Sequence, residues 1–197
     1  MKNQSIQIIA FGCSAGGFEA LGLLLPNLTQ NFPVPIVIVL HIPADSGSIL
    51  SDSFSKKCQM PVREVEDKTP LAPGNIYLAP ANYHLLVEPT GELSLSTEEP
   101  VHYSRPSIDV LFESVAMAYG PAALGIILTG ANADGAAGLK SILERGGRAI
   151  VQDPTEADYS TMPEAALLSN PNSEVMKISQ ISNFLTQLER KKNHGTD

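Results

Sequence analysis

Short apolar runs alternate along the chain with segments whose apolar residues recur at helical spacing. The runs are rich in β-branched residues and lack polar alternation, as in Ile-Val-Ile-Val-Leu at 36–40. This pattern is typical of strands that are buried on both faces of a sheet. We therefore predict strands at residues 6–11, 36–40, 62–65, 74–79, 124–128, 148–152 and 175–178.

The segments with helical spacing lie between these runs. In residues 107–119, for example, Ile108, Leu111 and Val115 share one helical face, and Gly146-Gly147 closes a helix that begins at Gly135. We predict helices at residues 18–25, 47–59, 107–119, 135–145, 163–168 and 181–188.

Residues 85–95 predict a hairpin, with Pro-Thr-Gly-Glu at 89–92 as its turn. Strands that alternate with helices favour a parallel sheet. The predicted fold class is thus α/β: a doubly wound, mostly parallel sheet flanked by helices, with an inserted antiparallel hairpin. We expect one domain over residues 1–189 and a flexible C-terminal tail over 190–197.

Composition narrows the class of protein. The 197 residues are 43% hydrophobic and 17% charged, which argues against disorder. The net charge of -8 disfavours binding to nucleic acid or to an anionic membrane, and no apolar run reaches the ~18 residues of a membrane span. Two cysteines, Cys13 and Cys58, form neither a disulfide framework nor a metal site. We therefore expect a cytoplasmic protein without a metal or cofactor and without membrane insertion.

A glycine-rich turn, Gly-Cys-Ser-Ala-Gly-Gly at 12–17, joins the first predicted strand to the first predicted helix. The spelling G-x-S-x-G matches the nucleophile-elbow pattern, which presents a serine on a sharp turn. Free N–H groups at the start of the helix, from Ala15 to Gly17, are suited to hold an oxyanion. The same turn would also suit a phosphate.

Three predicted strands deliver polar residues to one edge of the sheet. Ser14 follows the first strand, His41 the second, and Asp134 lies in the loop after the strand at 124–128. The carboxyl ends of parallel strands meet at one edge, where ligands bind. Each residue alone has an ordinary interpretation as a turn residue, a structural hydrogen-bonding group or a helix cap. Together they have the composition of a nucleophile, its general base and the carboxylate that orients the base.

Other reactive side chains are weaker candidates. Cys13 is a rival nucleophile, but we expect it to pack toward the sheet. Asp109 and Glu113 lie one helical turn apart, a spacing that usually marks a solvated face. None of the remaining histidines follows a parallel strand: His84, His102 and His194.

The motifs also match a known family in order and spacing. The matching stretches are Gly-Cys-Ser-Ala-Gly-Gly at 12–17 with Glu-Ala at 19–20, His-Ile-Pro at 41–43, Pro-Gly-Asn-Ile-Tyr-Leu-Ala-Pro at 73–80, Ser-Arg-Pro-Ser-Ile-Asp-Val-Leu-Phe at 104–112, Leu-Thr-Gly-Ala-Asn-Ala-Asp-Gly-Ala at 128–136, Gln-Asp at 152–153 and Met-Pro-Glu-Ala-Ala at 162–166. In these stretches the chain resembles the catalytic domain of the chemotaxis receptor methylesterases, protein-glutamate methylesterases that also deamidate receptor glutamines. The family's triad falls on Ser14, His41 and Asp134.

The resemblance implies a serine hydrolase that demethylates glutamate γ-methyl esters through an acyl-enzyme. The expected partners are the cytoplasmic helices of methyl-accepting chemotaxis receptors. Backbone N–H groups near Ala15, Gly16 and Gly17 and near Ala131 are the expected oxyanion donors. Arg105 is a candidate contact for acidic receptor helices, with a structural ion pair as an equal alternative. The order Ser, His, Asp differs from that of the α/β-hydrolases, so a different fold is expected to carry the same groups.

Three departures from the family pattern bear on activity. Ala15 stands where the family commonly has Thr or Ser, and Ala131 stands where it commonly has Met. We expect lowered or altered activity from these two changes. Family members often carry an N-terminal receiver domain, whereas the matching region here begins at about residue 6. We therefore expect constitutive activity or regulation by a separate receiver protein in trans.

Two other functions remain open. The loops 12–17 and 129–135 would form two anion-binding cradles in a phosphate- or nucleotide-binding module. Against this, the first loop is not G-x-G-x-x-G, and Asp134 would repel phosphate unless a metal intervened. A catalytically weakened receptor-binding scaffold is the other alternative, which Ala15 and Ala131 keep open.

Overall fold

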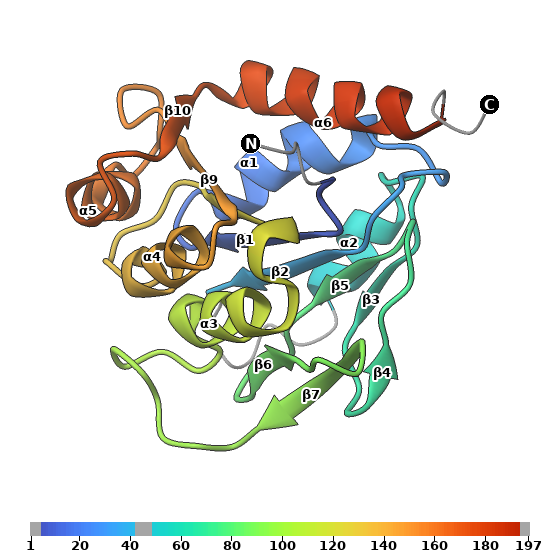
Figure 1. The fold of residues 1–197 in the computed structure, drawn as a ribbon, viewed down its shortest axis with the longest axis horizontal. Coiled ribbons are helices and arrows are strands. Elements are labelled where there is room, and N and C mark those ends of the chain that lie inside the picture. Colours follow the sequence, from blue (N-terminus) through green and yellow to red (C-terminus); the bar gives the residue numbers. More distant parts are fainter. Residues whose placement is uncertain (1–4, 42–48, 194–197) are drawn as a thin grey trace.

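A computed structural model describes residues 5–41 and 49–193, and its main feature is a seven-stranded parallel sheet (Figure 1). The strand order is β10-β9-β8-β1-β2-β5-β3. The strands are β1 (Ile8–Cys13), β2 (Ile36–Leu40), β3 (Val62–Glu64), β5 (Ile76–Leu78), β8 (Ala123–Ile127), β9 (Arg148–Gln152) and β10 (Glu174–Met176). The chain reverses its direction across the sheet at β1, so the predicted doubly wound fold is confirmed.

A small antiparallel sheet packs beside the main one. It has the order β4-β7-β6 and consists of β4 (Thr69–Pro70), β6 (His84–Val87) and β7 (Glu92–Ser96). Strands β6 and β7 form the predicted hairpin. Strand β4 was not predicted, because a two-residue strand that ends in proline carries no apolar periodicity.

Helices cover both faces of the main sheet (Figure 1). They are α1 (Gly17–Leu24), α2 (Ile49–Ser55), α3 (Ile108–Tyr119), α4 (Ala136–Glu144), α5 (Thr161–Ser169) and α6 (Ile178–Asn193), with 3₁₀ turns η1 (Leu25–Asn27) and η3 (Gly120–Ala122). Helices α1, α2 and α6 pack on one face, and α3, α4 and α5 pack on the other with the small sheet. Among the described helices, none combines the length and apolar character that crossing a membrane requires.

The helix boundaries differ most from prediction in α2 and α6. Within the predicted helix 47–59, α2 ends at Ser55, and residues 47–48 lie outside the described part. Helix α6 begins at Ile178, which shortens the last strand, and it continues to Asn193. It therefore includes the first residues of the predicted tail, whereas 194–197 are not described. Ile181 and Leu185 anchor this long polar helix in the core.

The central strands are buried on both faces, which explains their lack of polar alternation. Every residue of β1, β2 and β8 is buried. In β1, Ile9 and Phe11 face α1 and α6, whereas Ile8 and Ala10 face α3 and α4. A strand in this position must be apolar at each residue.

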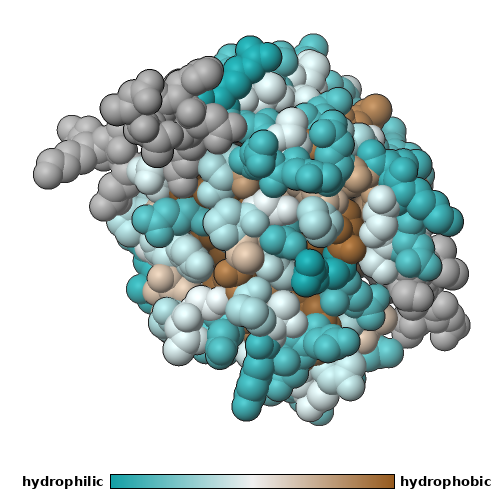
Figure 2. Space-filling model, turned by 90° about the vertical axis from the view of Figure 1, so that its right-hand side faces the viewer, coloured by the Kyte–Doolittle hydropathy of each residue, from teal (hydrophilic) through white to brown (hydrophobic). Residues whose placement is uncertain are grey.

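The edge strand β3 is not buried on both faces, and exposed charged side chains protect it from pairing with another chain. In β3 only Val62 is half-buried, whereas Arg63 and Glu64 are exposed. Figure 2 views the side of the molecule on which β3 and β4 lie in Figure 1, and the visible surface is mainly hydrophilic. Charged side chains on an edge strand oppose pairing with another chain.

Helices α3 and α4 are in close contact at Gly138, which yields a stability prediction. A methyl group at Gly138 would lie 2.7 Å from Phe112 Cβ and 2.8 Å from the Asp109 carbonyl oxygen. We expect Gly138→Ala to lower the free energy of unfolding by about 1–3 kcal/mol, because the backbones must separate. Urea denaturation measures this change.

The matched control is Gly22→Ala in α1, where a methyl group would meet nothing within 4 Å. That variant should gain up to about 1 kcal/mol, since alanine is the better helix former. Equal effects of the two substitutions would contradict the predicted close contact.

Candidate active site

The register of the parallel strands brings the predicted site residues to one edge of the sheet. Cys13 pairs with Leu40, so Ser14 and His41 are the next residues on neighbouring strands. The His41 N–H donates to the Cys13 carbonyl at 3.0 Å, and the Ser14 N–H donates to the Thr129 carbonyl at 3.0 Å. The ends of β1, β2 and β8 therefore meet as the sequence predicted.

The turn after β1 is fixed from two sides. Gly16 adopts a left-handed conformation with φ 76° at the N-cap of α1. The Gly17 N–H donates to the Ser14 carbonyl at 2.8 Å, and the Thr129 hydroxyl donates to the Ala15 carbonyl at 3.0 Å. Within the described part of the chain, the N–H groups of Ala15 and Gly16 have no acceptor. Of the three expected oxyanion donors in this turn, Ala15 and Gly16 thus have N–H groups without an acceptor among the described residues, and the Gly17 N–H is engaged.

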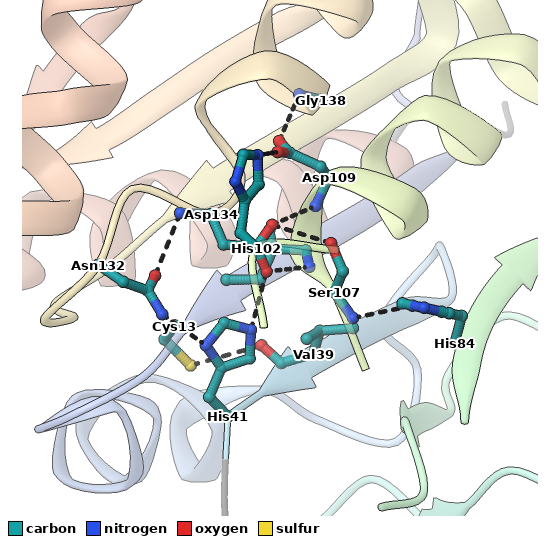
Figure 3. Close-up of polar contacts among 11 residues, drawn as sticks. Cys13, Val39, His41, His84, His102, Ser107, Asp109, Asn132, Asp134 and Gly138 are labelled. Carbon is teal, nitrogen blue, oxygen red and sulfur yellow. Dashed lines mark hydrogen bonds and ion pairs between the residues drawn. The ribbon is translucent and has the colours of Figure 1, made fainter. Parts of the chain in front are cut away.

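The carboxylate of Asp134 is buried, with 1% of the residue exposed, and it accepts four hydrogen bonds. Its Oδ2 accepts from His41 Nε2 at 2.8 Å and from the Ile108 N–H at 2.7 Å. Its Oδ1 accepts from the Ser107 hydroxyl at 2.9 Å and from the Asp109 N–H at 3.0 Å. Figure 3 shows these bonds converging on one side chain.

Three of the four donors belong to the N-terminus of α3, where unpaired N–H groups favour an anion. Burial alone would raise the pKa of Asp134. The hydrogen bonds from His41, Ile108 and Asp109 and the charge of His41 outweigh burial, so its pKa lies below the usual range. Asp134 is therefore a stable carboxylate that faces one nitrogen of His41.

The other ring nitrogen of His41 faces Asn132. Asn132 Nδ2 lies 3.2 Å from His41 Nδ1, and Asn132 Oδ1 accepts the Asp134 N–H at 3.1 Å (Figure 3). Among the described residues, no hydrogen bond joins the Ser14 hydroxyl to His41. Sequence analysis gave Asn132 no role, because an Asn before a helix start is normally a turn residue.

Two more residues of this site were missed. Ser107 is the N-cap of α3 and donates to Asp134, and its own N–H donates to His84 Nδ1 at 3.2 Å. His84 is 1% exposed, and its Nε2 lies 3.1 Å from the Glu99 carbonyl. The serine at the start of a predicted helix was a usable signal for Ser107. His84 lies 23 residues from Ser107, so no local pattern marked it.

The expectation of a solvated face at Asp109 and Glu113 was wrong for Asp109. Glu113 is exposed, but Asp109 is buried against α4, where its Oδ1 accepts the Gly138 N–H at 2.7 Å. His102 Nε2 lies 3.6 Å from Asp109 Oδ2. Burial raises the pKa of Asp109, the nearby Asp134 charge adds to this, and the Gly138 hydrogen bond opposes it. The helical period placed both carboxylates on one face without showing that α4 covers part of it.

Cys13 packs into the sheet, as predicted. It is fully buried, its thiol donates to the Val39 carbonyl at 3.9 Å, and burial raises its pKa well above the usual range. A thiol in this state is a poor nucleophile. Across residues 5–41 and 49–193, no three His, Cys, Asp or Glu side chains are grouped as metal ligands would be.

Arg105 and Ala131 lie at different parts of this region. The Arg105 guanidinium donates to the carbonyls of Thr97 at 2.8 Å and Glu98 at 3.0 Å, and these hydrogen bonds stabilise the loop after β7. Ala131 is exposed in the loop after β8, and its N–H has no acceptor among the described residues. His194 lies outside the described residues.

The sequence and the fold have counterparts in known proteins. Residues 9–185 match the family model of the CheB methylesterase. A putative protein-glutamate methylesterase/protein-glutamine glutaminase of Leptospira interrogans is 43% identical, over 93% of this chain and 95% of that protein. The protein-glutamate methylesterase FrzG of Myxococcus xanthus is 38% identical, over 91% of this chain and 54% of FrzG. The CheB methylesterase catalytic domain of Thermotoga maritima superposes with a TM-score of 0.88 and 29% identity, covering 94% of this chain and 100% of that domain.

The lowered pKa of Asp134 predicts how stability depends on pH. A carboxylate with a folded pKa below its unfolded value of about 3.9 stabilises the fold above that value, and the stabilisation disappears as pH falls through the folded pKa. The difference in unfolding free energy between the native chain and Asp134→Asn should therefore be largest near neutral pH and shrink in acid. Urea denaturation at a series of pH values measures it.

Asp109→Asn is the matched control, because the pKa of Asp109 is shifted the opposite way. A group whose pKa is raised on folding stabilises the protein below its unfolded pKa, and this stabilisation is lost as pH rises through the folded pKa. The difference in unfolding free energy between the native chain and Asp109→Asn should therefore change with pH in the opposite direction. Parallel pH curves for the two variants would contradict the opposite directions of the pKa shifts of these carboxylates.

Proposed function

The chain belongs to the CheB methylesterase family, and from that premise we propose that it is a serine hydrolase that demethylates glutamate γ-methyl esters on methyl-accepting chemotaxis receptors. The observation that carries the proposal is the pair of buried Asp134 and half-buried His41 at the sheet edge where Ser14 follows the neighbouring strand. An oriented histidine next to a half-buried turn serine is the arrangement that acyl transfer requires.

In the proposed first step, Ser14 Oγ attacks the carbonyl carbon of the methyl ester. His41 Nδ1 takes the hydroxyl proton, because Nε2 is already bonded to Asp134. The tetrahedral intermediate collapses, the bond to the methoxy oxygen breaks, and His41 returns the proton to give methanol. An acyl ester of Ser14 remains.

In the second step, water gives a proton to His41 Nδ1 and attacks the acyl carbon. The bond to Ser14 Oγ breaks, the serine regains its proton, and the glutamate carboxylate is released. The same two steps, starting from a glutamine amide, release ammonia instead of methanol, which is the proposed glutaminase activity. No metal or cofactor takes part in either reaction.

Asp134 supports the charge that develops on His41. In both steps the imidazole becomes an imidazolium, and its Nε2–H stays hydrogen-bonded to the buried carboxylate of Asp134. The hydrogen bonds from α3 already hold this carboxylate in place, so it needs no reorganisation as the charge develops.

The oxyanion would be stabilised by N–H groups on two loops. We assign this role to Ala15 and Gly16 on the turn after β1 and to Ala131 on the loop after β8, because these N–H groups lack acceptors among the described residues. Gly17 is left out because its N–H is bonded to the Ser14 carbonyl. The alanine side chains at 15 and 131 leave the backbone donors intact.

The proposed partners are the cytoplasmic helices of chemoreceptors, which places the enzyme in the cytoplasm. The chemotaxis assignment rests on the family and its relatives, and receptor identity is part of the proposal. Regulation by a separate receiver protein stays a prediction. Arg105 is less suited to the substrate contact expected of it, because its guanidinium is bonded to Thr97 and Glu98.

Nothing described in the fold favours a phosphate-binding module over a hydrolase. The α3 N-terminus, one natural anion site, is filled by Asp134. The weakened-scaffold alternative predicts binding without hydrolysis, so a turnover measurement separates it from the proposal.

The test is methanol release from a methyl-labelled chemoreceptor. We expect Ser14→Ala to lower the rate by at least about 10³-fold, since it removes the nucleophile. Cys13→Ala is the control on the adjacent residue. Its thiol is buried in the core between the sheet and α1, so this variant should keep activity near that of the native chain. Undiminished release by folded Ser14→Ala would rule out the serine mechanism.

A further inference from the structure

A closed ring of three hydrogen bonds surrounds the base of the proposed triad (Figure 3). The Asp134 N–H donates to Asn132 Oδ1 at 3.1 Å, and Asn132 Nδ2 lies 3.2 Å from His41 Nδ1. His41 Nε2 lies 2.8 Å from Asp134 Oδ2, which returns the ring to its starting residue. Both nitrogens of His41 thus have partners, and neither partner is Ser14.

The donor and acceptor roles in this ring follow from its one fixed donor. A backbone N–H can only donate, so the Asn132 atom facing Asp134 N must be the amide oxygen. The atom facing His41 is then the NH₂ group, which also can only donate. His41 Nδ1 must therefore accept with its lone pair, and the ring proton of His41 lies on Nε2, toward the carboxylate.

Of the two ring nitrogens of His41, this assignment leaves only Nδ1 able to receive the Ser14 proton. The lone pair of Nδ1 already accepts a hydrogen bond from the Asn132 amide. On the basis of the proposed function, we propose that Asn132 is a positioning residue that caps the base: its amide must leave His41 Nδ1 before Ser14 can be deprotonated. Capping therefore adds a step before acylation and lowers the rate of the resting enzyme.

The surroundings of Asn132 are consistent with a removable cap. Asn132 is half-buried, and its neighbours Ala131 and Ala133 are exposed and small. The bond from Nε2 to Asp134 holds the ring of His41 independently of Asn132. The amide can thus turn away while the imidazole stays in place.

Two substitutions test the cap in opposite directions. In Asn132→Ser, the hydroxyl can still accept the Asp134 N–H as a turn residue, but the donor to Nδ1 is gone. In Asn132→Asp, which has the same shape, a carboxylate oxygen would face Nδ1 and hold a proton there. The readout is the rate at which a fluorophosphonate labels Ser14, located by peptide mass spectrometry.

Labelling uses the proposed first step with a small probe. Ser14 Oγ attacks phosphorus, the P–F bond breaks, fluoride leaves, and the serine proton goes to His41. We expect Asn132→Ser to be labelled roughly 3- to 10-fold faster than the native chain, the rate equivalent of one lost hydrogen bond. We expect Asn132→Asp to be labelled at least about tenfold more slowly.

A merely structural role for Asn132 predicts slower labelling in both variants, so that result would overturn the proposal. A second measurement does not depend on Ser14. The ¹⁵N resonance of His41 Nδ1 should move toward the position of a free ring nitrogen in Asn132→Ser. An unchanged resonance refutes the cap, whatever the labelling rates.

These outcomes distinguish a failure of the Asn132 cap from a failure of the proposed serine-hydrolase function. If folded native chain and both variants all escape labelling, the serine-hydrolase function fails, and the ¹⁵N resonance still decides whether the amide caps His41. If the native chain is labelled and Asn132→Ser is labelled no faster, the function stands and the cap is refuted.

Discussion

The buried carboxylate of Asp134 is the group on which the rest of the site depends. A buried charge without partners would cost several kcal/mol, so the fold must supply donors for it. It does so with the N-terminus of α3, the Ser107 hydroxyl and His41. The helix start can come this close because Gly12 has no side chain: a methyl group there would lie 2.3 Å from Ile108 Cγ2. A structural requirement thus determines where the proposed general base, His41, lies.

The same requirement couples the site to the packing of α3 against α4. Asp109, two residues after the N-cap of α3, accepts the Gly138 N–H near the start of α4, and the Asp134 loop leads into that helix. His84 of the small sheet holds the other side of the α3 N-terminus through Ser107. The inserted hairpin therefore supports the site, although it adds no residue to the proposed triad. Hydrogen bonds thus connect the α3–α4 contact to His41 through Asp109 and Asp134.

The parts that sequence predicted are those that follow from one local pattern and one topological rule. Buried β-branched runs marked the central strands, and the meeting of parallel strand ends placed Ser14, His41 and Asp134 at one edge. Contacts between distant segments were not predictable in this way. Asp109 lies on a helical face that α4 covers, and His84 reaches the helix cap from another sheet. Periodicity describes one element and contains no information about its neighbours.

The occupied Nδ1 of His41 shows why the Asp–His pair alone does not define the state of the base. Asp134 fixes which nitrogen carries the proton, and what faces the other nitrogen decides whether the lone pair is available. Here the loop that supplies Asp134 also supplies Asn132, so one turn both orients the base and occupies it. A paired nitrogen is the more stable state for a half-buried imidazole, whereas the proposed mechanism needs the nitrogen unpaired. The amide of Asn132 therefore stabilises the resting site and, in the proposed mechanism, also keeps His41 Nδ1 from accepting a proton.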